Sequence, residues 1–251
     1  MPFLKQAVKS ILAQSYRNFE LIIIDDKSTD RSYSYIKKIK DKRVKILRNY
    51  RNLGIALSLN TGINYSKGEY IARMDADDIS VGDRLEKQLK FLRSSNSISI
   101  CGSYASLINE KGKVIGSRKF PTKDKEIKKA LNFYSPIIHP TFFGKASFFK
   151  NLSGYNPDYD YAEDYELLIR AGNSYKMANI PEYLLLWRLW DGRRSRLNMK
   201  KMDKLDLAIK WTNFKRNSKL LTLAILVRKA LFMILIPADI KVKFSQILRK
   251  T

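Results

Sequence analysis

The sequence predicts an α/β fold in which a mostly parallel sheet is covered by helices. Short apolar runs such as Phe19–Asp25 are rich in Ile, which is typical of buried strands. These runs alternate with segments whose apolar residues recur every three or four positions, the pattern of strand–helix–strand units. The chain has 251 residues, of which 45% are hydrophobic. That length and composition suffice for one domain with a packed core and an appendage.

The first third of the chain alternates regularly between the two element types. In the first segment, Leu4, Val8 and Ile11 share one helix face, and Pro2 suits a first helical turn. Strands are predicted at Phe19–Asp25, Val44–Leu47 and Glu69–Met74. Helices are predicted at Pro2–Ser15, Arg31–Lys40, Ile55–Tyr65 and Arg84–Leu92.

The pattern changes after about residue 97, where two strands follow each other directly. Ser97–Leu107 and Val114–Arg118 are separated by Asn109–Gly112, whose sequence NEKG predicts a hairpin turn. The later strands are predicted at Thr141–Gly144 and Pro181–Leu189. The later helices are predicted at Lys123–Leu131, Lys145–Asn151, Glu163–Ala171, Met199–Lys215 and Leu220–Ile236.

The net charge of +24 suggests a polyanionic partner, which could be nucleic acid, an anionic membrane or a phosphorylated small molecule. Residues 191–251 hold 16 Lys or Arg and 4 Asp or Glu, so half of the net charge lies in the last quarter of the chain. A single Cys and a single His argue against a disulfide framework and a His-ligated zinc site.

Three aspartates, Asp75, Asp77 and Asp78, directly follow the predicted strand Glu69–Met74. In open α/β sheets, ligands bind beyond the carboxyl ends of strands. Three carboxylates within four residues repel one another, so a cation would stabilise them. A hard divalent ion such as Mg²⁺ or Mn²⁺ fits, because it takes oxygen ligands and leaves positions for phosphate and water. The alternative is a solvated acidic turn that caps the helix starting at Arg84.

A second acidic pair, Asp25 and Asp26, ends the first predicted strand. An Asp at this position can accept a hydrogen bond from a base N–H or a ribose hydroxyl. The alternative is a strand-end cap formed with Ser28 and Thr29.

A third acidic pair, Glu163 and Asp164, begins a predicted helix. Asp164 can act there as a general base that deprotonates an acceptor hydroxyl within hydrogen-bond reach. The alternative is a favourable contact between a carboxylate and the helix dipole.

Six segments, taken together, resemble the family-2 glycosyltransferases of the GT-A fold. They occur in the order and spacing of that family over residues 3–195. The similarity is greatest to bacterial-type enzymes that build capsule, O-antigen or other surface glycans. The segments are FELIIIDDKSTD, NLGIALSLNTGI, GEYIARMDADD, DRLEKQ, SGYNPDYDYAEDYELLIR and the stretch around Trp187–Arg188.

The resemblance implies a single-displacement transfer of a sugar from a nucleotide-diphosphate donor to a glycan or lipid-linked acceptor, with inversion at the anomeric carbon. Asp75 and Asp77 match the pair that holds a divalent metal (Mn or Mg) and the donor's diphosphate and ribose, and Asp77 is the expected direct ligand. Asp26 matches the residue that contacts the nucleobase. Asp164 matches the general base, and Glu163 matches its supporting neighbour.

The resemblance also places Asp25, Asn52 and Arg188 on the nucleotide side. Arg188 matches an arginine near the diphosphate, and its alternative is a structural ion-pair residue. His139 resembles a position that lines the acceptor side, and its alternative is a core histidine whose hydrogen bonds are satisfied.

Arg84 and Gln88 lie four residues apart and therefore share one face of a predicted helix. We expect them to brace the DADD turn, and the alternative is an exposed pair on the helix surface.

The chain departs from the family pattern at two places. The family opens with a strand reading like VSVIIPxYN, whereas this sequence begins inside the helix that follows it. That strand is central in the sheet, so its neighbours would keep unpaired backbone groups, each at a cost of about 1–3 kcal/mol. We expect either a start upstream of Met1 or a degenerate copy with weak or no donor binding. The second departure is Trp190, which stands where the family often has a His.

We divide the chain into a catalytic domain at residues 1–195 and a basic helical tail at residues 196–251. Leu220–Ile236 is apolar but contains Arg228 and Lys229. Each central charge costs about 2.5–3.5 kcal/mol on insertion, so no spanning helix is predicted. The expectation is an amphipathic helix on an anionic membrane surface, in a cytoplasmic protein peripheral to the inner face of the membrane. The alternative is a helix packed on the catalytic domain or in a dimer interface.

The sequence therefore predicts a metal-dependent glycosyltransferase of surface-polysaccharide synthesis. Two other functions are weighed against it. One is a catalytically inactive, membrane-associated remnant. The other is a basic nucleic-acid-binding protein, which is disfavoured because no recognition motif is present and three acidic sites would repel phosphates.

Overall fold

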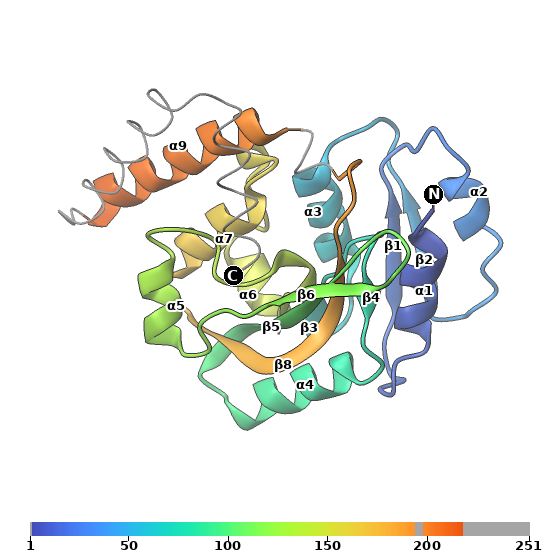
Figure 1. The fold of residues 1–251 in the computed structure, drawn as a ribbon, viewed down its shortest axis with the longest axis horizontal. Helices are drawn as coiled ribbons and strands as arrows, with labels where there is room; N and C mark the ends of the chain where they lie inside the picture. The colour runs from blue at the N-terminus through green and yellow to red at the C-terminus, as the bar shows by residue number, and fades with distance from the viewer. Residues whose placement is uncertain (1, 194–197, 218–251) are drawn as a thin grey trace.

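The first part of the chain forms a parallel pair of strands flanked by helices (Figure 1). The structure is a computed structural model that describes residues 2–193 and 198–217. Helix α1 (Leu4–Leu12) leads to β1 (Leu21–Asp25), and α2 (Ser32–Ile36) leads to β2 (Val44–Arg48). Helix α2 is shorter than predicted, because Ile36 is its one buried residue and its Ser and Tyr residues are weak helix formers.

A larger sheet follows, in the order β3–β7–β5–β8–β4, and β6 pairs with the free part of β5. Strand β8 begins earlier than predicted, because its first residues continue the pairing with β5. The strands are β3 (Tyr70–Ala72), β4 (Ile79–Ser80), β5 (Ile98–Ile108), β6 (Val114–Arg118), β7 (Phe143–Lys145) and β8 (Lys176–Arg188).

The α/β fold class is confirmed, but the larger sheet is mixed rather than mostly parallel. Among its described pairings, β5–β8 is parallel, and β3–β7, β4–β8, β5–β6 and β5–β7 are antiparallel. A parallel pairing needs a long crossover, which the helices between β5 and β8 provide. The hairpin β5–β6 and the short strands β4 and β7 join the sheet without such a crossover.

The larger sheet carries its core on the side of α6 and α7. Four residues with no exposed surface show how distant segments meet there: Ile100 of β5, Phe142 before β7, Leu167 of α7 and Met177 of β8. The remaining helices are α3 (Ile55–Tyr65), α4 (Arg84–Ser94), α5 (Asp124–Ala130), α6 (Ala146–Asn151), α7 (Glu163–Ala171) and α9 (Met199–Asn217), with 3-10 turns at His139–Thr141 and Pro157–Tyr159.

Helix α9 packs on the domain next to α7 (Figure 1). Ile209 joins the core, and Lys210 donates a hydrogen bond from Nζ to the carbonyl oxygen of Phe133 at 2.7 Å. The predicted membrane helix Leu220–Ile236 lies outside the described residues. None of the described helices combines the length and the hydropathy that crossing a membrane requires.

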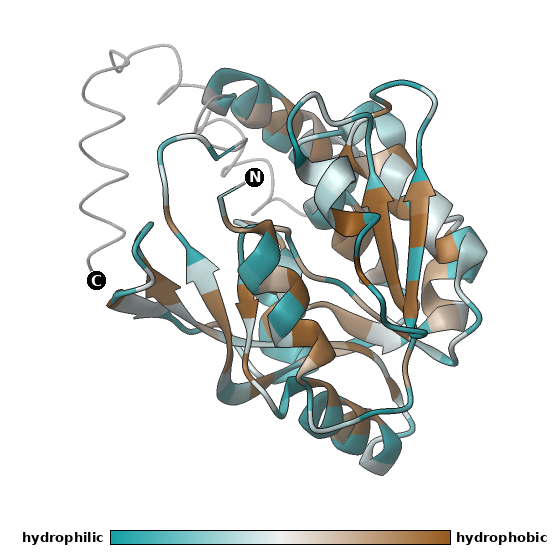
Figure 2. Cartoon of the chain, turned by 90° about the vertical axis from the view of Figure 1, so that its right-hand side faces the viewer, coloured by the Kyte–Doolittle hydropathy of each residue, from teal (hydrophilic) through white to brown (hydrophobic). Residues whose placement is uncertain are grey.

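A cavity of about 960 Å³ lies between the two sheets, and residues of both β1 and β3 line it. Each of these strands pairs on one side only within the described residues, β1 with β2 and β3 with β7. Figure 2 shows the strand pair β1–β2 standing apart from the larger sheet. Within the described residues the two sheets are thus separate.

Candidate functional site

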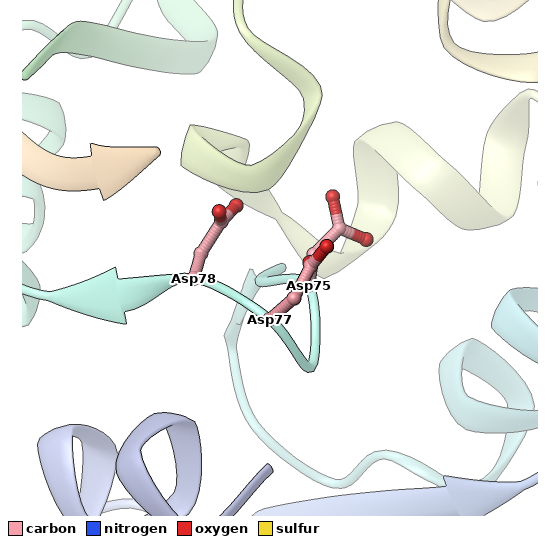
Figure 3. A group of neighbouring side chains, drawn as sticks. All are labelled: Asp75, Asp77 and Asp78. Atoms are coloured by element: carbon pink, nitrogen blue, oxygen red, sulfur yellow. The ribbon is translucent and has the colours of Figure 1, made fainter. Parts of the chain in front are cut away.

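The three aspartates of the DADD turn lie together at the carboxyl end of β3. The apolar strand Tyr70–Ala72 pairs with β7, and the chain then leaves the sheet and turns before β4. One carboxylate oxygen from each of Asp75, Asp77 and Asp78 lies within 4.8 Å of the others. Figure 3 shows all three side chains rising from this turn.

Arg84 and Gln88 are fully buried behind the end of β3, just before the DADD turn, so they are not the exposed pair that was the alternative. Arg84 donates from Nη2 to the carbonyl oxygen of Arg73 at 2.6 Å and from Nη1 to that of Pro140 at 3.0 Å. Its Nε donates to Gln88, which in turn donates to the carbonyl oxygen of Thr141. Burial lowers the pKa of Arg84 to about 10, so the side chain remains charged at neutral pH.

The carboxylates of the DADD turn have few protein partners. Asp75 forms an ion pair with Arg73, with an Nη2–Oδ1 distance of 2.5 Å. Asp77 accepts from Nε1 of Trp190 at 2.8 Å. The buried Asp78 accepts from the backbone N–H of Arg188 through Oδ1, whereas its Oδ2 has no hydrogen-bond partner among the residues that the structure describes.

This shortage of donors leaves the turn electrostatically strained. Burial and the neighbouring charge of Asp75 raise the pKa of Asp77. Burial, together with the charges of Asp75 and Asp77, raises the pKa of Asp78 well above its usual range. A divalent cation fits this cluster, because it would offset the repulsion, and the buried, unbonded oxygen of Asp78 is of the type such ions take.

Arg188 is fully buried beneath the DADD turn and donates to four protein acceptors. Its Nε donates to the carbonyl oxygen of Asp77 at 2.8 Å, and its Nη1 donates to those of Asn109 and Glu110 at 3.0 Å. Its Nη2 donates to the side chain of Gln6 at 2.7 Å. This geometry favours a structural role for Arg188 over a contact with the donor diphosphate.

The carboxylate of Asp25 is buried at the end of β1 and points to partners within its own strand pair. Its Oδ2 lies 3.0 Å from Nε of Arg48, and its Oδ1 accepts from the backbone N–H of Ser28 at 3.3 Å. These contacts favour the strand-end cap as the role of Asp25 over a contact with the nucleotide.

Asp26 holds the loop that leads into α3. It accepts from the backbone N–H groups of Leu53 and Gly54 at 2.8 and 2.9 Å and from Nδ2 of Asn49 at 2.8 Å. Burial would raise its pKa, but these hydrogen bonds outweigh that effect and hold the pKa below its usual value. Asn52 is exposed in the same loop.

Glu163 and Asp164 occupy the first turn of α7. Asp164 accepts from Oγ of Ser135 at 3.2 Å, and Glu163 accepts from the backbone N–H of Tyr161 at 2.8 Å. Burial and the charge of Asp164 raise the pKa of Glu163 to about 7, and burial raises the pKa of Asp164. Both groups therefore bind protons more tightly than ordinary carboxylates.

His139 is buried against Glu163. Its Nε2 lies 3.0 Å from the hydroxyl oxygen of Tyr155, and its Nδ1 lies 3.6 Å from Oε1 of Glu163. Burial, followed by the charge of Arg73, lowers the pKa of His139 well below its usual value, so the ring is neutral. These contacts favour the core alternative for His139, next to a candidate acidic site.

The structure brings the DADD turn and the Glu163–Asp164 pair around one buried cation, Arg73. This side chain pairs with Asp75, and its charge offsets part of the rise that burial causes in the pKa values of Glu163 and Asp164. Asp26 lies on the β1 side of the cavity, with Asp75 on the β3 side. The DADD turn and the Glu163–Asp164 pair are thus adjacent, and Asp26 lies across the cavity from Asp75.

Sequence reasoning missed four side chains that contact these carboxylates. An arginine inside the apolar run YIARM was a usable signal, because an unpaired buried charge is costly. The other three come from distant segments, and no local pattern connects them to the site. The four are Arg48, Asn49, Arg73 and Ser135.

Three comparisons with known proteins agree with this arrangement. Residues 1–152 match the family model described as Glycosyl transferase family 2. An uncharacterized glycosyltransferase of Haemophilus influenzae is 37% identical over 204 residues, which are 77% of this chain and 63% of that protein. The chain thus spans less than two thirds of this relative. The O-antigen biosynthesis glycosyltransferase WbnJ of Escherichia coli is 35% identical over 192 residues, 73% of each chain.

Among solved structures, the crystal structure of S. aureus TarS 1–349 in complex with UDP-GlcNAc is similar to this chain. The TM-score is 0.72 and the sequence identity is 15%, with 94% of this chain and 73% of that chain covered. At this identity the similarity shows a shared fold.

Proposed function

Because the chain belongs to glycosyltransferase family 2 and has the GT-A fold, we propose that it transfers a sugar from a nucleotide-diphosphate donor to a glycan or lipid-linked acceptor in surface-polysaccharide synthesis. The observation that carries this proposal is the Asp75–Asp77–Asp78 cluster at the carboxyl end of β3. The names of two similar proteins support the donor and the pathway. One acts in O-antigen biosynthesis, and the other was crystallised with UDP-GlcNAc.

On the donor side, Asp77 and Asp75 would hold a divalent metal ion, Mn²⁺ or Mg²⁺. When bound, such an ion offsets the negative charge that develops on a leaving diphosphate. Asp78 adds a third carboxyl group to this cluster, and Trp190 orients Asp77 through its N–H group. Asp26 and Asn52 would contact the nucleoside from the opposite side of the cavity.

On the acceptor side, Asp164 is the proposed general base. Its raised pKa suits it to accept the proton of an acceptor hydroxyl near neutral pH. The hydroxyl oxygen would then attack the anomeric carbon from the side opposite the leaving diphosphate, which inverts the configuration. Glu163 would support the base, and Ser135 orients its carboxylate.

Arg188, Asp25 and His139 take positioning roles in this proposal. Arg188 fixes the backbone of the DADD turn through the carbonyl oxygen of Asp77. Asp25 fixes the end of β1 through Arg48, and His139 packs beside Glu163.

We further propose that the basic C-terminal region attaches the protein to the inner, cytoplasmic face of a membrane, where a lipid-linked acceptor would be met. The charge of residues 191–251, with 16 basic and 4 acidic side chains, supports this proposal. Flotation with anionic liposomes should fall with salt and on deletion of residues 219–251. Equal flotation without these residues would contradict it.

The test of the transfer mechanism is Asp164→Asn. Release of UDP from UDP-N-acetylglucosamine, measured with a lipid-linked oligosaccharide acceptor, should fall by about 10²–10⁴-fold, the usual contribution of a general base. UDP binding in the presence of Mn²⁺, measured by calorimetry, should stay unchanged. The exposed Asp158→Asn serves as the matched control, and unchanged turnover of Asp164→Asn would remove Asp164 as the base.

A further inference from the structure

Two neighbouring aromatic side chains, Phe133 and Tyr134, are exposed on the loop that follows α5. The exposed fraction is 38% for Phe133 and 43% for Tyr134. Both rings line a shallow cavity of about 320 Å³, whose other walls come from Pro121, Glu126, Lys129 and Ala130. Apolar and aromatic walls with a few polar groups are typical of a site for a small ligand.

Buried side chains of two helices hold this loop in place. The carbonyl oxygen of Phe133 accepts from Nζ of Lys210 in α9 at 2.7 Å. The carbonyl oxygen of Leu131 accepts from the hydroxyl group of Tyr165 in α7 at 2.5 Å. Lys210 and Tyr165 are both buried. The loop is therefore ordered before any ligand binds, which lowers the entropy cost of binding.

The buried side chain of Asn179 joins the same loop to the segment that follows β6. Its Nδ2 donates to the carbonyl oxygen of Pro121 at 2.7 Å and to that of Pro136 at 2.9 Å. Phe120 precedes Pro121, and its ring lies against that of Tyr134, with 5.9 Å between the centroids. A second aromatic ring thus adjoins the exposed pair.

The ring of Phe120 belongs to an apolar surface that begins at the DADD turn. Met74, Phe120 and Trp187 are partly buried and pack against one buried cluster on the larger sheet. Met74 directly precedes Asp75 in the chain. The apolar surface therefore extends from the candidate metal site to Tyr134.

The loop also contacts the proposed general base. Ser135 follows Tyr134 and donates from Oγ to Oδ2 of Asp164 at 3.2 Å. Successive Cα atoms lie only about 3.8 Å apart. A molecule that places one hydroxyl group at Asp164 would therefore have its next ring near Tyr134.

A pyranose ring has the chemistry that this cavity fits. The C–H groups on a sugar ring face are weakly positive and pack on the negative face of an aromatic ring. Its hydroxyl groups can donate to the carboxylate of Glu126 and accept from the ammonium group of Lys129. A phosphate group fits less well, because Glu126 would repel it.

We propose that Phe133 and Tyr134, together with Phe120, form an acceptor subsite that stacks the second pyranose ring of an oligosaccharide. The first ring is the one whose hydroxyl group Asp164 deprotonates, so this inference rests on the proposed function. The acceptor would then be an oligosaccharide of two or more sugars, rather than a single sugar on a lipid.

The first test measures binding without donor or turnover, so it does not depend on Asp164 being the base. The probe is an array of bacterial surface oligosaccharides that presents each terminal sugar both alone and at the end of a disaccharide. The labelled full chain should bind at least one disaccharide about tenfold more tightly than its terminal sugar, the gain expected from one stacked ring. Failure to bind any glycan, or equal binding of both lengths, would overturn the proposal.

A set of variants tests the aromatic ring itself. Tyr134→Ala removes the ring and should lose the preference for the disaccharide, whereas Tyr134→Phe keeps the ring and should retain it. Tyr65→Ala is the matched control, because Tyr65 is 45% exposed on α3. Equal loss in Tyr134→Ala and Tyr65→Ala would contradict the subsite. If Tyr134→Ala fails to fold, the array with the unchanged chain still decides.

Kinetics with a lipid-linked oligosaccharide acceptor separate the subsite from the proposed function. Tyr134→Ala should raise the KM for the acceptor about tenfold and leave kcat and UDP binding unchanged, because the ring contacts the ground state and the transition state equally. A lower kcat at unchanged KM would overturn the subsite. If the unchanged chain prefers disaccharides on the array but releases no UDP, the proposed transfer fails and the subsite is supported.

Discussion

Two acidic strand ends in this molecule contain the same residue type and have opposite electrostatics. At the end of β1, Asp26 accepts three hydrogen bonds from the α3 loop and Asn49, and its pKa is lowered. In the turn after β3, the pKa values of Asp77 and Asp78 are raised, because burial and mutual repulsion outweigh their few hydrogen bonds.

The difference separates Asp26, which stabilises the fold, from the aspartates of the DADD turn, whose charge a bound ligand would stabilise. The chain itself supplies the donors that keep Asp26 charged, so this carboxylate contributes to stability without help. The carboxylates of the DADD turn have few hydrogen-bond donors of their own. A bound cation would therefore stabilise them more than it would stabilise Asp26. Substitution of Asp26 should therefore destabilise the fold, whereas substitutions in the DADD turn should affect ligand binding alone.

The largest expected effect is on ligand binding by Asp77→Ala. Calorimetry with Mn²⁺ and UDP should show affinity reduced by at least 100-fold, or about 2.7 kcal/mol, because a direct metal ligand is removed. Urea unfolding without metal should show unchanged or slightly higher stability, because one repulsive charge is gone. Asp83→Ala, which removes a surface pair with Lys87, is the control and should bind normally.

If Asp77→Ala destabilised the metal-free protein as much as it weakened binding, the proposed contrast between the two strand ends would fail. Unchanged Mn²⁺-dependent UDP binding would instead remove Asp77 as the ligand and leave the rest of the comparison standing.

The next effect is on folding by Asp26→Ala, which should lower the free energy of unfolding by about 2–3 kcal/mol. It leaves the N–H groups of Leu53 and Gly54 and the side chain of Asn49 without their acceptor. Because the folded pKa of Asp26 is lowered, its contribution is present above the ordinary value of 3.8 and is lost as the pH falls through the folded pKa.

Urea titrations at pH 7 and at pH 3 measure this effect, and the gap between the Asp26→Ala and unchanged chains should narrow at the lower pH. The exposed Asn52→Ala in the same loop should change stability by less than about 0.5 kcal/mol. An equal loss of unfolding free energy in both variants would mean that any substitution in the loop destabilises the protein. The hydrogen bonds of Asp26 would then not explain the effect.

The fold was predictable where local pattern and tertiary environment agree. Ile55–Tyr65, Val114–Arg118 and Glu163–Ala171 have the predicted bounds, because their periodicity and flanking residues mark both ends. The strand directions were not predictable in the same way. Pairing depends on which segments meet in space, and the antiparallel entry of β7 between β3 and β5 has no local signal.

For the candidate site, the sequence predicted the three acidic groups but not their surroundings. Aspartates at strand ends can be identified from the sequence. The residues that determine their charge come from segments that are distant in the sequence. Arg48 reaches Asp25 from a neighbouring strand, and Trp190 reaches Asp77 across 113 residues of sequence. The roles of the acids themselves stay predictions until the variants are measured.

The smallest expected effect extends the comparison to the third acidic pair, which resembles the DADD turn. Burial and Asp164 raise the pKa of Glu163 from 4.5 to about 7, so the folded protein binds a proton that the unfolded chain has released between these values. Stability should therefore fall as the pH rises from 4.5 to 7. Glu163→Gln should remove this part of the slope, because Gln has no proton to release. Its oxygen can still accept from the N–H of Tyr161, so the local structure is kept.

The neutral, buried His139 acts in the opposite direction, because only the unfolded chain binds a proton there near pH 6.5. The informative quantity is therefore the difference between the Glu163→Gln and unchanged chains, measured by urea unfolding at several pH values, in which the contribution of His139 cancels. Superimposable pH profiles would show that Glu163 is ionised in the folded state like an ordinary surface carboxylate. The acidic pair of α7 would then belong with Asp26, among the acids whose charge the fold itself stabilises.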